Sequence, residues 1–316
     1  MSESKKVEIL RKVLGSFYPS GEERLFFCPK CSHHKRKLSA NIEKDVFKCW
    51  VCDYHGRSLR KLIRNYGSFK DLTSWSELSN DIDVSSFGEN LFDEEEEIYE
   101  QVVDLPKEFV SLANKSLPMS ALMAKNYLIS RGLTRQDFVR WKIGYCTEGE
   151  YKERIIVPSF GLTGRPNYFI ARSYTNNWKK YMNPPAGRNI IFNHLFVDFD
   201  EDLILVEGVF DAIIAGPNSL PILGSTLREE SKLFQEVVRN DSTVYLALDP
   251  DAEKKSMRLI KSLLSYGIEI HKVNIAPYKD VAEMSKEEFQ KRKTQSVVMD
   301  SNNYLLETLN ANLMSI

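Results

Sequence analysis

The sequence predicts an α/β protein with an N-terminal ribbon, an acidic linker and a mixed α/β core that contains a parallel sheet flanked by helices. Three observations lead to this prediction. Apolar, strand-like runs alternate with helix-periodic segments from residue 202 onward. Two C-x-x-C pairs stand near the N-terminus, and a stretch without Lys or Arg separates them from the α/β region.

Size and composition are those of an ordinary globular protein. The 316 residues suffice for about two domains. Hydrophobic residues make up 42% and charged residues 28% of the chain, which is typical of proteins in water. No apolar run is long enough to cross a bilayer, and the N-terminus lacks the apolar core of a signal peptide. We therefore expect a cytoplasmic protein without membrane contact.

The net charge of −1 hides a strong segregation of charge. Residues 1–70 contain 16 Lys/Arg and 7 Asp/Glu, a balance of +9, which suits a polyanionic partner. Residues 71–106 contain no Lys or Arg and 12 Asp/Glu, a balance of −12. Their like charges repel, so we predict an extended linker, with a solvated helix over residues 93–103 as the alternative at its end. Residues 107–316 are nearly balanced, at +2.

Four cysteines in the basic head have the spacing of a zinc site. Cys28 and Cys31 form one C-x-x-C pair, Cys49 and Cys52 form the other, and 17 residues lie between the pairs. Each pair can direct two thiolates at one ion, while the segment between them runs as a hairpin with a polar turn at Glu43–Asp45. Two disulfides are the alternative, which an intracellular chain disfavours. Three histidines stand nearby as rival ligands, namely His33, His34 and His55.

Basic and aromatic residues surround the cysteines. The basic ones are Lys30, Lys35, Arg36, Lys37, Lys48, Arg57, Arg60, Lys61 and Arg64. Positive charges follow a phosphate backbone, so we expect Lys35 and Arg36 to contact nucleic acid. Trp50 is a further candidate because aromatic faces stack on unpaired bases, although for this residue alone we favour a place in the small core.

The α/β region reads as alternating strands and helices. Strands are predicted at 202–208, 219–225, 242–249 and 268–276, and helices at 209–216, 227–240 and 252–267. The strands lack polar alternation, which indicates a parallel sheet covered on both faces.

Acidic residues stand at the carboxyl ends of these strands, where parallel sheets bind ligands. Glu207 ends one strand, Asp249 and Asp251 follow another, and Asp280 follows the last. Two such charges about 4 Å apart repel by roughly 4 kcal/mol at an effective dielectric of about 20, so a cation is needed. Mg²⁺, or Mn²⁺, prefers oxygen ligands. For Asp251, capping of a helix that begins at Ala252 is an alternative.

The segments "VEGVFDAI", "ALDPDAEKK" and "YKDVAEM" resemble the three signature segments of the TOPRIM domain. DnaG-type primases, topoisomerases, RecR-like repair proteins and some nucleases share this domain. The resemblance implies that Glu207, Asp249 and Asp251 form the metal-binding edge. It also implies a catalytic role for Asp211, which matches a further acid of the family one helical turn after Glu207.

The third segment departs from the bacterial pattern. Bacterial primases usually carry D-x-D there, whereas this chain has Ala282 in place of the second acid and Glu283 beside it. This form resembles that of bacteriophage primases. Asp280 is the implied ligand of this segment.

The residues before the sheet distinguish among TOPRIM proteins. Residues 126–146 resemble the Y-L-x-x-R-G-L segment of DnaG-type primases, and "KKYMNPPAG" resembles the K-Y-x-N segment of their basic motif. The match points to Lys180, Tyr181 and Asn183 as contacts for nucleic acid or nucleotide. The resemblance covers the cysteine-bearing head and residues 126–283.

Side chains alternate between the two faces of a strand, so four residues of one predicted strand share a face, namely Tyr168, Ile170, Arg172 and Tyr174. Arg172 can thus lie on an open surface beside aromatic groups. We expect a basic groove leading to the acids, lined by Arg154, Arg165, Arg172, Lys179 and Lys180. Surface salt bridges are the alternative for these residues.

The resemblance implies a DNA primase, which joins ribonucleoside triphosphates into short RNA primers on single-stranded DNA by metal-dependent nucleotidyl transfer. A replicative helicase and a single-stranded-DNA-binding protein are the implied partners, and no G-x-x-x-x-G-K-[ST] loop occurs in the chain. A TOPRIM nuclease and a zinc-ribbon DNA clamp are the rival interpretations. The predicted parts are a zinc ribbon (1–70), an acidic linker (71–106), a basic subdomain (107–201), a TOPRIM subdomain (202–284) and a helical tail (285–316).

Overall fold

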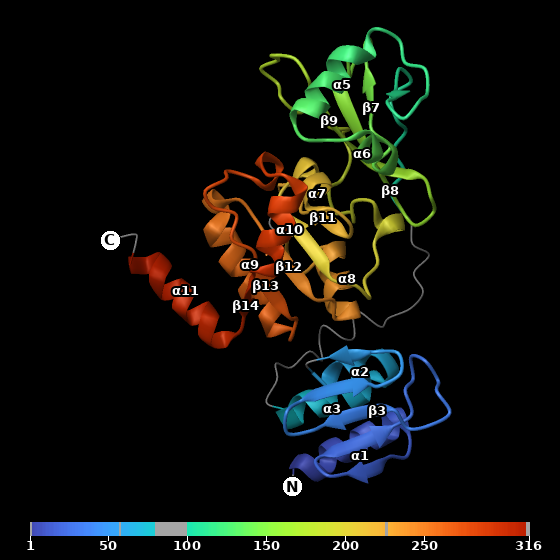
Figure 1. Ribbon diagram of the computed structural model, residues 1–316, viewed down its shortest axis with the longest axis vertical. Helices are drawn as coiled ribbons and strands as arrows, with labels where there is room; N and C mark the ends of the chain where they lie inside the picture. The colour runs from blue at the N-terminus through green and yellow to red at the C-terminus, as the bar shows by residue number, and fades with distance from the viewer. Residues whose placement is uncertain (1, 57, 80–99, 225–226, 314–316) are drawn as a thin grey trace. The chain divides into compact units, whose positions relative to one another are not determined.

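The computed structural model describes residues 2–56, 58–79, 100–224 and 227–313. The chain forms two compact units, a first one within residues 1–96 and a second one that takes up most of residues 97–316. The first unit is blue to cyan in Figure 1, and the second runs from green to red. Each unit has its own hydrophobic core.

The first unit contains a five-stranded antiparallel sheet in the order β1-β2-β3-β4-β5. Its strands are β1 (Tyr18–Ser20), β2 (Glu23–Phe26), β3 (Leu38–Asn41), β4 (Val46–Cys49) and β5 (His55–Gly56). The predicted hairpin is confirmed, because β3 pairs with β4 and the turn at Glu43–Asp45 lies between them. Asp45 completes the turn with a φ of 52°, a left-handed conformation that aspartate tolerates.

Helices supply the other half of this small core. They are α1 (Ser2–Leu14), α2 (Arg60–Tyr66) and α3 (Phe69–Ser79). Leu10 of α1, Leu62 of α2 and Trp75 of α3 pack with Phe26 and Leu38 of the sheet. Burying one such large apolar side chain stabilises the fold by about 1.5–3 kcal/mol, so each helix contributes substantially.

The predicted linker overlaps α3. We placed residue 71 at the start of the linker, whereas Leu72 and Trp75 of α3 are buried in the core of the first unit. The acidic composition of residues 71–106 concealed this short amphipathic segment at its start. Residues 80–99 lie outside the described part of the chain, so the extended linker stays a prediction. Arg57, one of the basic residues near the cysteines, also lies outside it.

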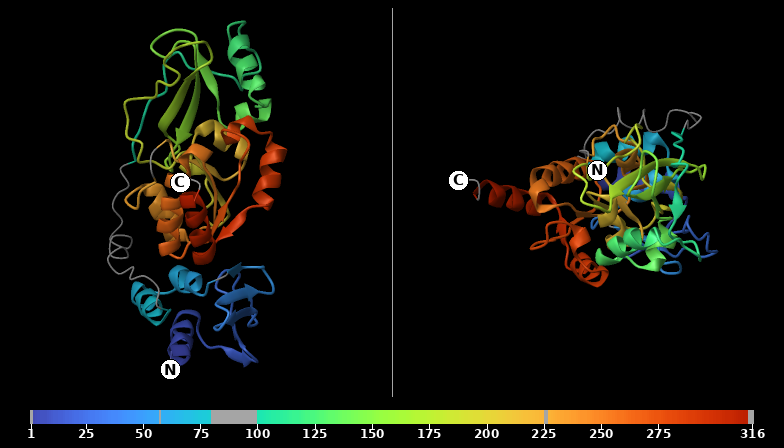
Figure 2. Two further views of the ribbon diagram at one scale, coloured as in Figure 1. Left: turned by 90° about the vertical axis from the view of Figure 1, so that its left-hand side faces the viewer. Right: turned by 90° about the horizontal axis from the view of Figure 1, so that it is seen from above.

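The second unit contains two sheets. The first is antiparallel, in the order β6-β7-β8-β9, with β6 (Val110–Ser111), β7 (Gly144–Cys146), β8 (Arg154–Phe160) and β9 (Pro166–Ser173). Helices α5 (Ala121–Ser130) and α6 (Arg135–Arg140) lie on one side of it (Figures 1 and 2).

The second sheet has the order β11-β10-β12-β13-β14. Its strands are β10 (Leu203–Val206), β11 (Ser219–Pro221), β12 (Val244–Ala247), β13 (Ile270–Lys272) and β14 (Val297–Met299). Its helices are α7 (Val209–Ala215), α8 (Lys232–Asn240), α9 (Glu253–Ser265), α10 (Lys286–Thr294) and α11 (Ser301–Leu313). Figure 2 shows α9 and α10 on opposite sides of the sheet. The first four strands in chain order are parallel, as predicted.

The predicted helical tail contains a strand. β14 lies within residues 285–316 and pairs antiparallel with β13 at the edge of the sheet. Its run of two valines and a methionine favours a strand wherever an open edge is available. The sheet therefore extends beyond residue 284, where we had expected the TOPRIM part to end.

One hydrophobic core joins the two sheets of the second unit. Tyr168 and Ile170 of β9 pack in the same cluster as Ile204 and Val206 of β10. The intervening residue Phe169 belongs to a separate cluster on the other face of β9. The face predicted from period two is thus confirmed, and it directs β9 toward the parallel sheet.

A buried ion pair also joins the two parts of this unit. Thr134 and Asp137 form a capping box at the start of α6, and Asp137 additionally contacts Lys286 of α10. Burial alone would raise the pKa of Asp137, but the Lys286 ammonium and the Thr134 donors outweigh it and hold that pKa below its ordinary value.

Of the helices in the described part of the chain, none has the length and apolarity needed to span a membrane.

Replacing Asp137→Asn is expected to lower the free energy of unfolding by about 1–3 kcal/mol, less than for a fully buried pair because Lys286 is partly exposed. The measurement is urea unfolding, with Glu201→Gln as the exposed control. Since the folded-state pKa is depressed, the difference should persist above the unfolded pKa of about 4 and shrink as the pH falls through the lower folded value. An equal difference at all pH values would contradict the ion pair.

Candidate metal centres and nucleic-acid interface

The four predicted cysteines lie together in the first unit. All four sulfur atoms fall within 4.8 Å of one another. The Cys28 and Cys52 sulfurs are 3.8 Å apart, and the Cys31 and Cys49 sulfurs are 3.9 Å apart. A tetrahedron with Zn–S bonds of about 2.3 Å has edges of about 3.8 Å, so the cluster has the size of a zinc site. The histidines lie outside this group of ligands.

Matching backbone turns present the two cysteine pairs. The amide of Ser32 donates to the carbonyl of Cys28 over 2.9 Å, and the amide of Asp53 donates to the carbonyl of Cys49 over 3.1 Å. Ser32 and Asp53 both have positive φ, 49° and 57°. Each turn thereby folds its two thiols toward the same point.

The thiols differ in their tendency to ionise. Burial raises the pKa of Cys28 to about 12. Burial also acts on Cys49, but the backbone amides of Cys52 and Val51 outweigh it and lower its pKa to about 7. Four neighbouring thiolates require a cation, and Zn²⁺ fits this all-sulfur set.

Replacing Cys28→Ser should remove bound zinc, because three remaining thiolates hold the ion much more weakly. Zinc content by elemental analysis should fall from about one to near zero per chain, and the first unit should unfold. Cys146→Ala is the matched control, since Cys146 is buried in the second unit. Loss of zinc from the control would show that the ion is held elsewhere.

The predicted acids gather at the edge of the parallel sheet. Val206 of β10 pairs in register with Ala247 of β12, so the residues that follow them leave the sheet side by side. Carboxylate oxygens of Glu207, Asp249 and Asp251 lie within 4.8 Å of one another. Pro250 begins a short 3₁₀ turn (Pro250–Ala252), which returns Asp251 toward the other two.

The capping alternative for Asp251 is wrong. Helix α9 begins at Glu253, its N-cap position is Ala252, and this position has no side-chain capping bond. Asp251 lies within the 3₁₀ turn, one residue before that N-cap position. Asp251 therefore belongs with the acids of the sheet edge.

Several carboxylate oxygens at this edge are buried without a hydrogen-bond partner in the described part of the chain. They belong to Glu207, Asp249 and Asp280. Burial, and then the charges of Asp211 and Glu207, raise the pKa of Asp249 to about 7. Buried, unpaired acceptors of this kind fit a divalent cation with oxygen ligands, such as Mg²⁺.

Asp211 has a different position from the three clustered acids. Its carboxylate accepts hydrogen bonds from the amides of Gly208 and Ala282, both over 2.9 Å. Burial and the charge of Asp280 raise its pKa to about 6. Asp211 thus connects the start of α7 to the segment that follows Asp280. Glu283 likewise accepts from the amide of Lys279, over 3.0 Å, within that segment.

The raised pKa of Asp249 predicts that protons compete with the metal. Below a pH of about 7, affinity for Mn²⁺ should fall by about tenfold per pH unit, because one proton must leave for each ion bound. Calorimetric titration at several pH values measures this slope. Asp249→Asn should bind weakly and lose the slope, whereas a wild-type affinity independent of pH would contradict the assignment.

Arg172 lies among aromatic side chains. Its Nε donates to the hydroxyl of Tyr127 over 2.6 Å, and a second nitrogen donates to the hydroxyl of Tyr181. The guanidinium carbon is 5.1 Å from the centre of the Tyr181 ring and 5.2 Å from that of Phe210. Phe210 lies in the first turn of α7, so Arg172 stacks on the helix that follows Glu207.

Arg131 is a neighbour that sequence reasoning missed. Its guanidinium carbon lies 5.2 Å from the Phe210 ring and 5.8 Å from the Tyr127 ring. Its Nε is buried and has no hydrogen-bond partner in the described part of the chain. Arg131 is the arginine of the Y-L-x-x-R-G-L segment, and its place in that segment could have identified it as a candidate.

The remaining predicted basic residues do not form one groove. Arg154 is only 4% exposed and donates to the carbonyls of Lys179 and Lys180, so it holds their loop instead of lining an open surface. Lys180 is exposed, and Asn183 accepts from the amide of Ala171 on β9 over 3.1 Å.

Arg165 lies at the opposite end of β9 from Arg172. It is exposed in the turn between β8 and β9. Arg172 comes seven positions after Arg165, which along a strand is about 23 Å at roughly 3.3 Å per residue. Arg165 therefore stands apart from the acidic edge.

Candidate contacts in the first unit also differ from expectation. Lys35 is exposed, whereas Arg36 donates to Ser16 and lies over the Phe27 ring, 4.5 Å from its centre. Trp50 is 69% exposed, so the expectation that it fills the small core is wrong. Trp75, which is 1% exposed, takes that place from α3.

The fold and these two sites define a class: a ribbon unit with a four-cysteine cluster joined to an α/β unit whose parallel sheet has an acidic edge. No protein-family model matches the chain. The chain is 23% identical over 313 residues to a DNA primase of Thermotoga maritima, covering 83% of this chain and 54% of that protein. It is 22% identical over 304 residues to a DNA primase of Clostridium acetobutylicum, covering 80% and 50%. It thus spans about half the length of the curated relatives it matches.

Solved structures show the same likeness. A DnaG primase catalytic domain bound to ssDNA has a TM-score of 0.52 at 18% identity and covers 61% of this chain and 76% of its own. A DNA primase domain from Pseudomonas aeruginosa has a TM-score of 0.51 at 20% identity, with coverages of 63% and 79%. The predicted resemblance to DnaG-type primases is confirmed. Because these structures are only 18% and 20% identical to the chain, they establish its fold alone.

Proposed function

We propose that the protein is a DNA primase, which synthesises short RNA primers on single-stranded DNA by divalent-metal-dependent nucleotidyl transfer. One observation carries the proposal: oxygens of Glu207, Asp249 and Asp251 form a cluster, and two guanidinium groups stack on Phe210 of the helix that follows Glu207. Phe210, which both Arg131 and Arg172 contact, follows Glu207 by three residues and lies in the first turn of α7. The sequence likeness to proteins named DNA primase supports this reading.

The acidic and the basic residues of the site would have different roles. Glu207, Asp249 and Asp251 would hold Mg²⁺ or Mn²⁺, with Asp280 beside them. Bound metal ions of this kind assist attack by a hydroxyl and neutralise a departing pyrophosphate. Arg131 and Arg172 would bind phosphate groups of the nucleotide. Tyr127 and Tyr181 orient Arg172 before the substrate arrives, which lowers the entropy lost on binding.

Asp211 would act as a positioning residue in this scheme. It accepts from the amides of Gly208 and Ala282 and so fixes the loop that follows Asp280. The zinc unit would bind the template strand through its basic surface, to which Lys35 contributes.

The proposal extends to partners and location. The substrates would be ribonucleoside triphosphates and a single-stranded DNA template. A replicative helicase and a single-stranded-DNA-binding protein would be partners at a replication fork in the cytoplasm. The resemblance to DnaG-type primases supports these assignments.

Asp249→Ala should lower primer synthesis by about a hundredfold or more, since losing a metal ligand removes several kcal/mol of transition-state stabilisation. The measurement is incorporation of labelled ribonucleotides on single-stranded DNA with Mg²⁺. The variant should remain folded and should bind oligonucleotides as the wild type does, and Asp200→Ala, an exposed acid before β10, is the control. Wild-type primer synthesis by Asp249→Ala would refute the assignment. Shortening of the DNA without added nucleotides would indicate a nuclease.

A further inference from the structure

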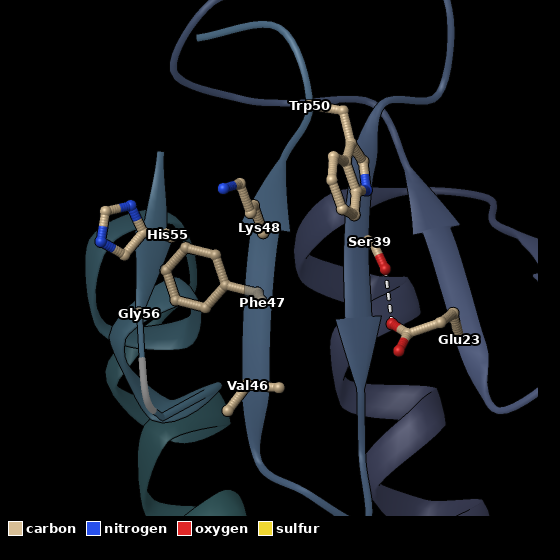
Figure 3. A pocket seen from close by; sticks show the side chains of 8 residues that line it. All are labelled: Glu23, Ser39, Val46, Phe47, Lys48, Trp50, His55 and Gly56. Carbon is tan, nitrogen blue, oxygen red and sulfur yellow. Dashed lines mark hydrogen bonds between the residues drawn. The ribbon is translucent and has the colours of Figure 1, made fainter. Parts of the chain in front are cut away.

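The zinc unit has a second feature, a pocket on the face of its sheet that the helices leave open. Its volume is about 280 Å³. It is lined by Glu23, Ser39, Val46, Phe47, Lys48, Trp50, His55 and Gly56 (Figure 3). Leu38 and Ala40 of β3 are buried in the core, and Ser39 between them faces the pocket because successive strand residues point to opposite faces.

The floor of the pocket is firmly built. The ring of Phe47 is almost fully buried, and Gly56 lies directly against it. A Cβ atom at Gly56 would come within 2.4 Å of that ring, so only glycine allows this packing. The pocket is therefore a fixed part of the sheet.

Trp50 provides an aromatic wall. Its side chain is 69% exposed, which is unusual for so large an apolar group in a unit that buries Trp75. The Lys48 ammonium lies 5.4 Å from the centre of the Trp50 ring. Exposed aromatic faces beside cations are the elements on which proteins stack unpaired nucleobases.

Glu23 provides acceptors in the same pocket. Ser39 donates to one of its carboxylate oxygens, and Asn41 donates to the other over 3.2 Å. Ser39 and Asn41 are buried, so the carboxylate is held in place by neutral groups. Glu22, by contrast, pairs with Lys44, and Asp53 pairs with Lys48.

This arrangement selects for a base and against a phosphate. A fixed carboxylate repels phosphate and requires hydrogen-bond donors from its ligand. Each oxygen of Glu23 has spare acceptor capacity beyond the bond it already accepts. Lys48 keeps donors beyond the one it directs at Asp53, 2.9 Å away. The pocket thus offers two adjacent acceptors, one donor and a stacking surface.

We propose that this pocket binds one unpaired guanine of the DNA template. The N1–H and N2–H groups of guanine would donate to the two oxygens of Glu23, its O6 would accept from Lys48, and its ring would stack on Trp50. Adenine and cytosine present one donor beside an acceptor on this edge, and thymine presents one donor between two carbonyls. The inference rests on the proposed function and deepens it, since it names a base that the zinc unit reads.

The test uses the full-length protein and fluorescence anisotropy. The probes are a labelled oligothymidylate and the same strand with a single central dG, dC, dA or deoxyinosine. The dG strand should bind about tenfold more tightly than the all-thymine strand, the value expected of a good bidentate contact. Deoxyinosine, which lacks the N2 amino group, should lose most of this gain.

Two variants assign the preference to residues. Glu23→Gln should reduce the dG preference to about threefold or less, because glutamine replaces one acceptor with a donor. Glu22→Gln is the matched control: it removes the same charge from the neighbouring residue and should keep the preference. Trp50→Ala should weaken binding of every strand by about tenfold, as expected for loss of stacking. Zinc content and unfolding midpoints verify that the variants fold.

The possible outcomes separate this inference from the proposed function. A dG preference that survives in Glu23→Gln, or that falls equally in Glu22→Gln, overturns the assignment. Equal wild-type binding of the dG and deoxyinosine strands also overturns it, and this comparison needs no variant. Primer synthesis on a mixed-sequence template could persist in each of these cases. Conversely, Asp249→Ala should keep the dG preference while losing synthesis, so the two claims can fail independently.

Discussion

The parallel register of β10 and β12 is the constraint on which the second unit depends. Because Val206 and Ala247 are paired, the chain delivers Glu207 and Asp249 to the same point as the two strands end. Repulsion between two such charges is roughly 4 kcal/mol at about 4 Å and an effective dielectric of about 20. The pKa of Asp249, raised to about 7 by burial and by its acidic neighbours, is the direct consequence. A cation turns this unfavourable arrangement into a binding site.

Two adjacent residues of helix α7 contact the segments on either side of that site. Asp211 fixes the segment that follows Asp280, and Phe210 packs against Arg131 and Arg172 on the side of the antiparallel sheet. One helical turn thus contacts both the acidic segment and the two arginines. The shared core of β9 and β10 keeps the two sheets in this relation, so hydrophobic packing sets the electrostatic geometry.

The sequence predicted those features that depend on local spacing. The cysteine pairs, the strand and helix alternation, and the acids at strand ends follow from periodicity and from the rule that parallel strands end together. Period two gave the correct face of β9, but it could not tell what occupies that face. Arg154 and Arg172 lie on neighbouring strands, yet one is engaged by backbone carbonyls and the other by tyrosine hydroxyls. Such partners come from helix α5 and from the loop after β9, which the strand pattern does not place. In the same way, Trp75 of α3 fills the small core that was expected to hold Trp50, a tertiary contact that an acidic composition conceals.

The charge of the first unit has a further implication for how it would discriminate among nucleic acids. Lysine and arginine attract every phosphate alike, so a surplus of positive charge gives affinity without selectivity. Selectivity requires groups that contact base edges, and an acceptor is the one that phosphates cannot satisfy. In this unit Glu22, Asp53 and Asp71 are paired with lysines. Glu23 is instead anchored by Ser39 and Asn41, which keeps its charge available in a basic setting. Affinity and selectivity are therefore assigned to different residues of one small sheet.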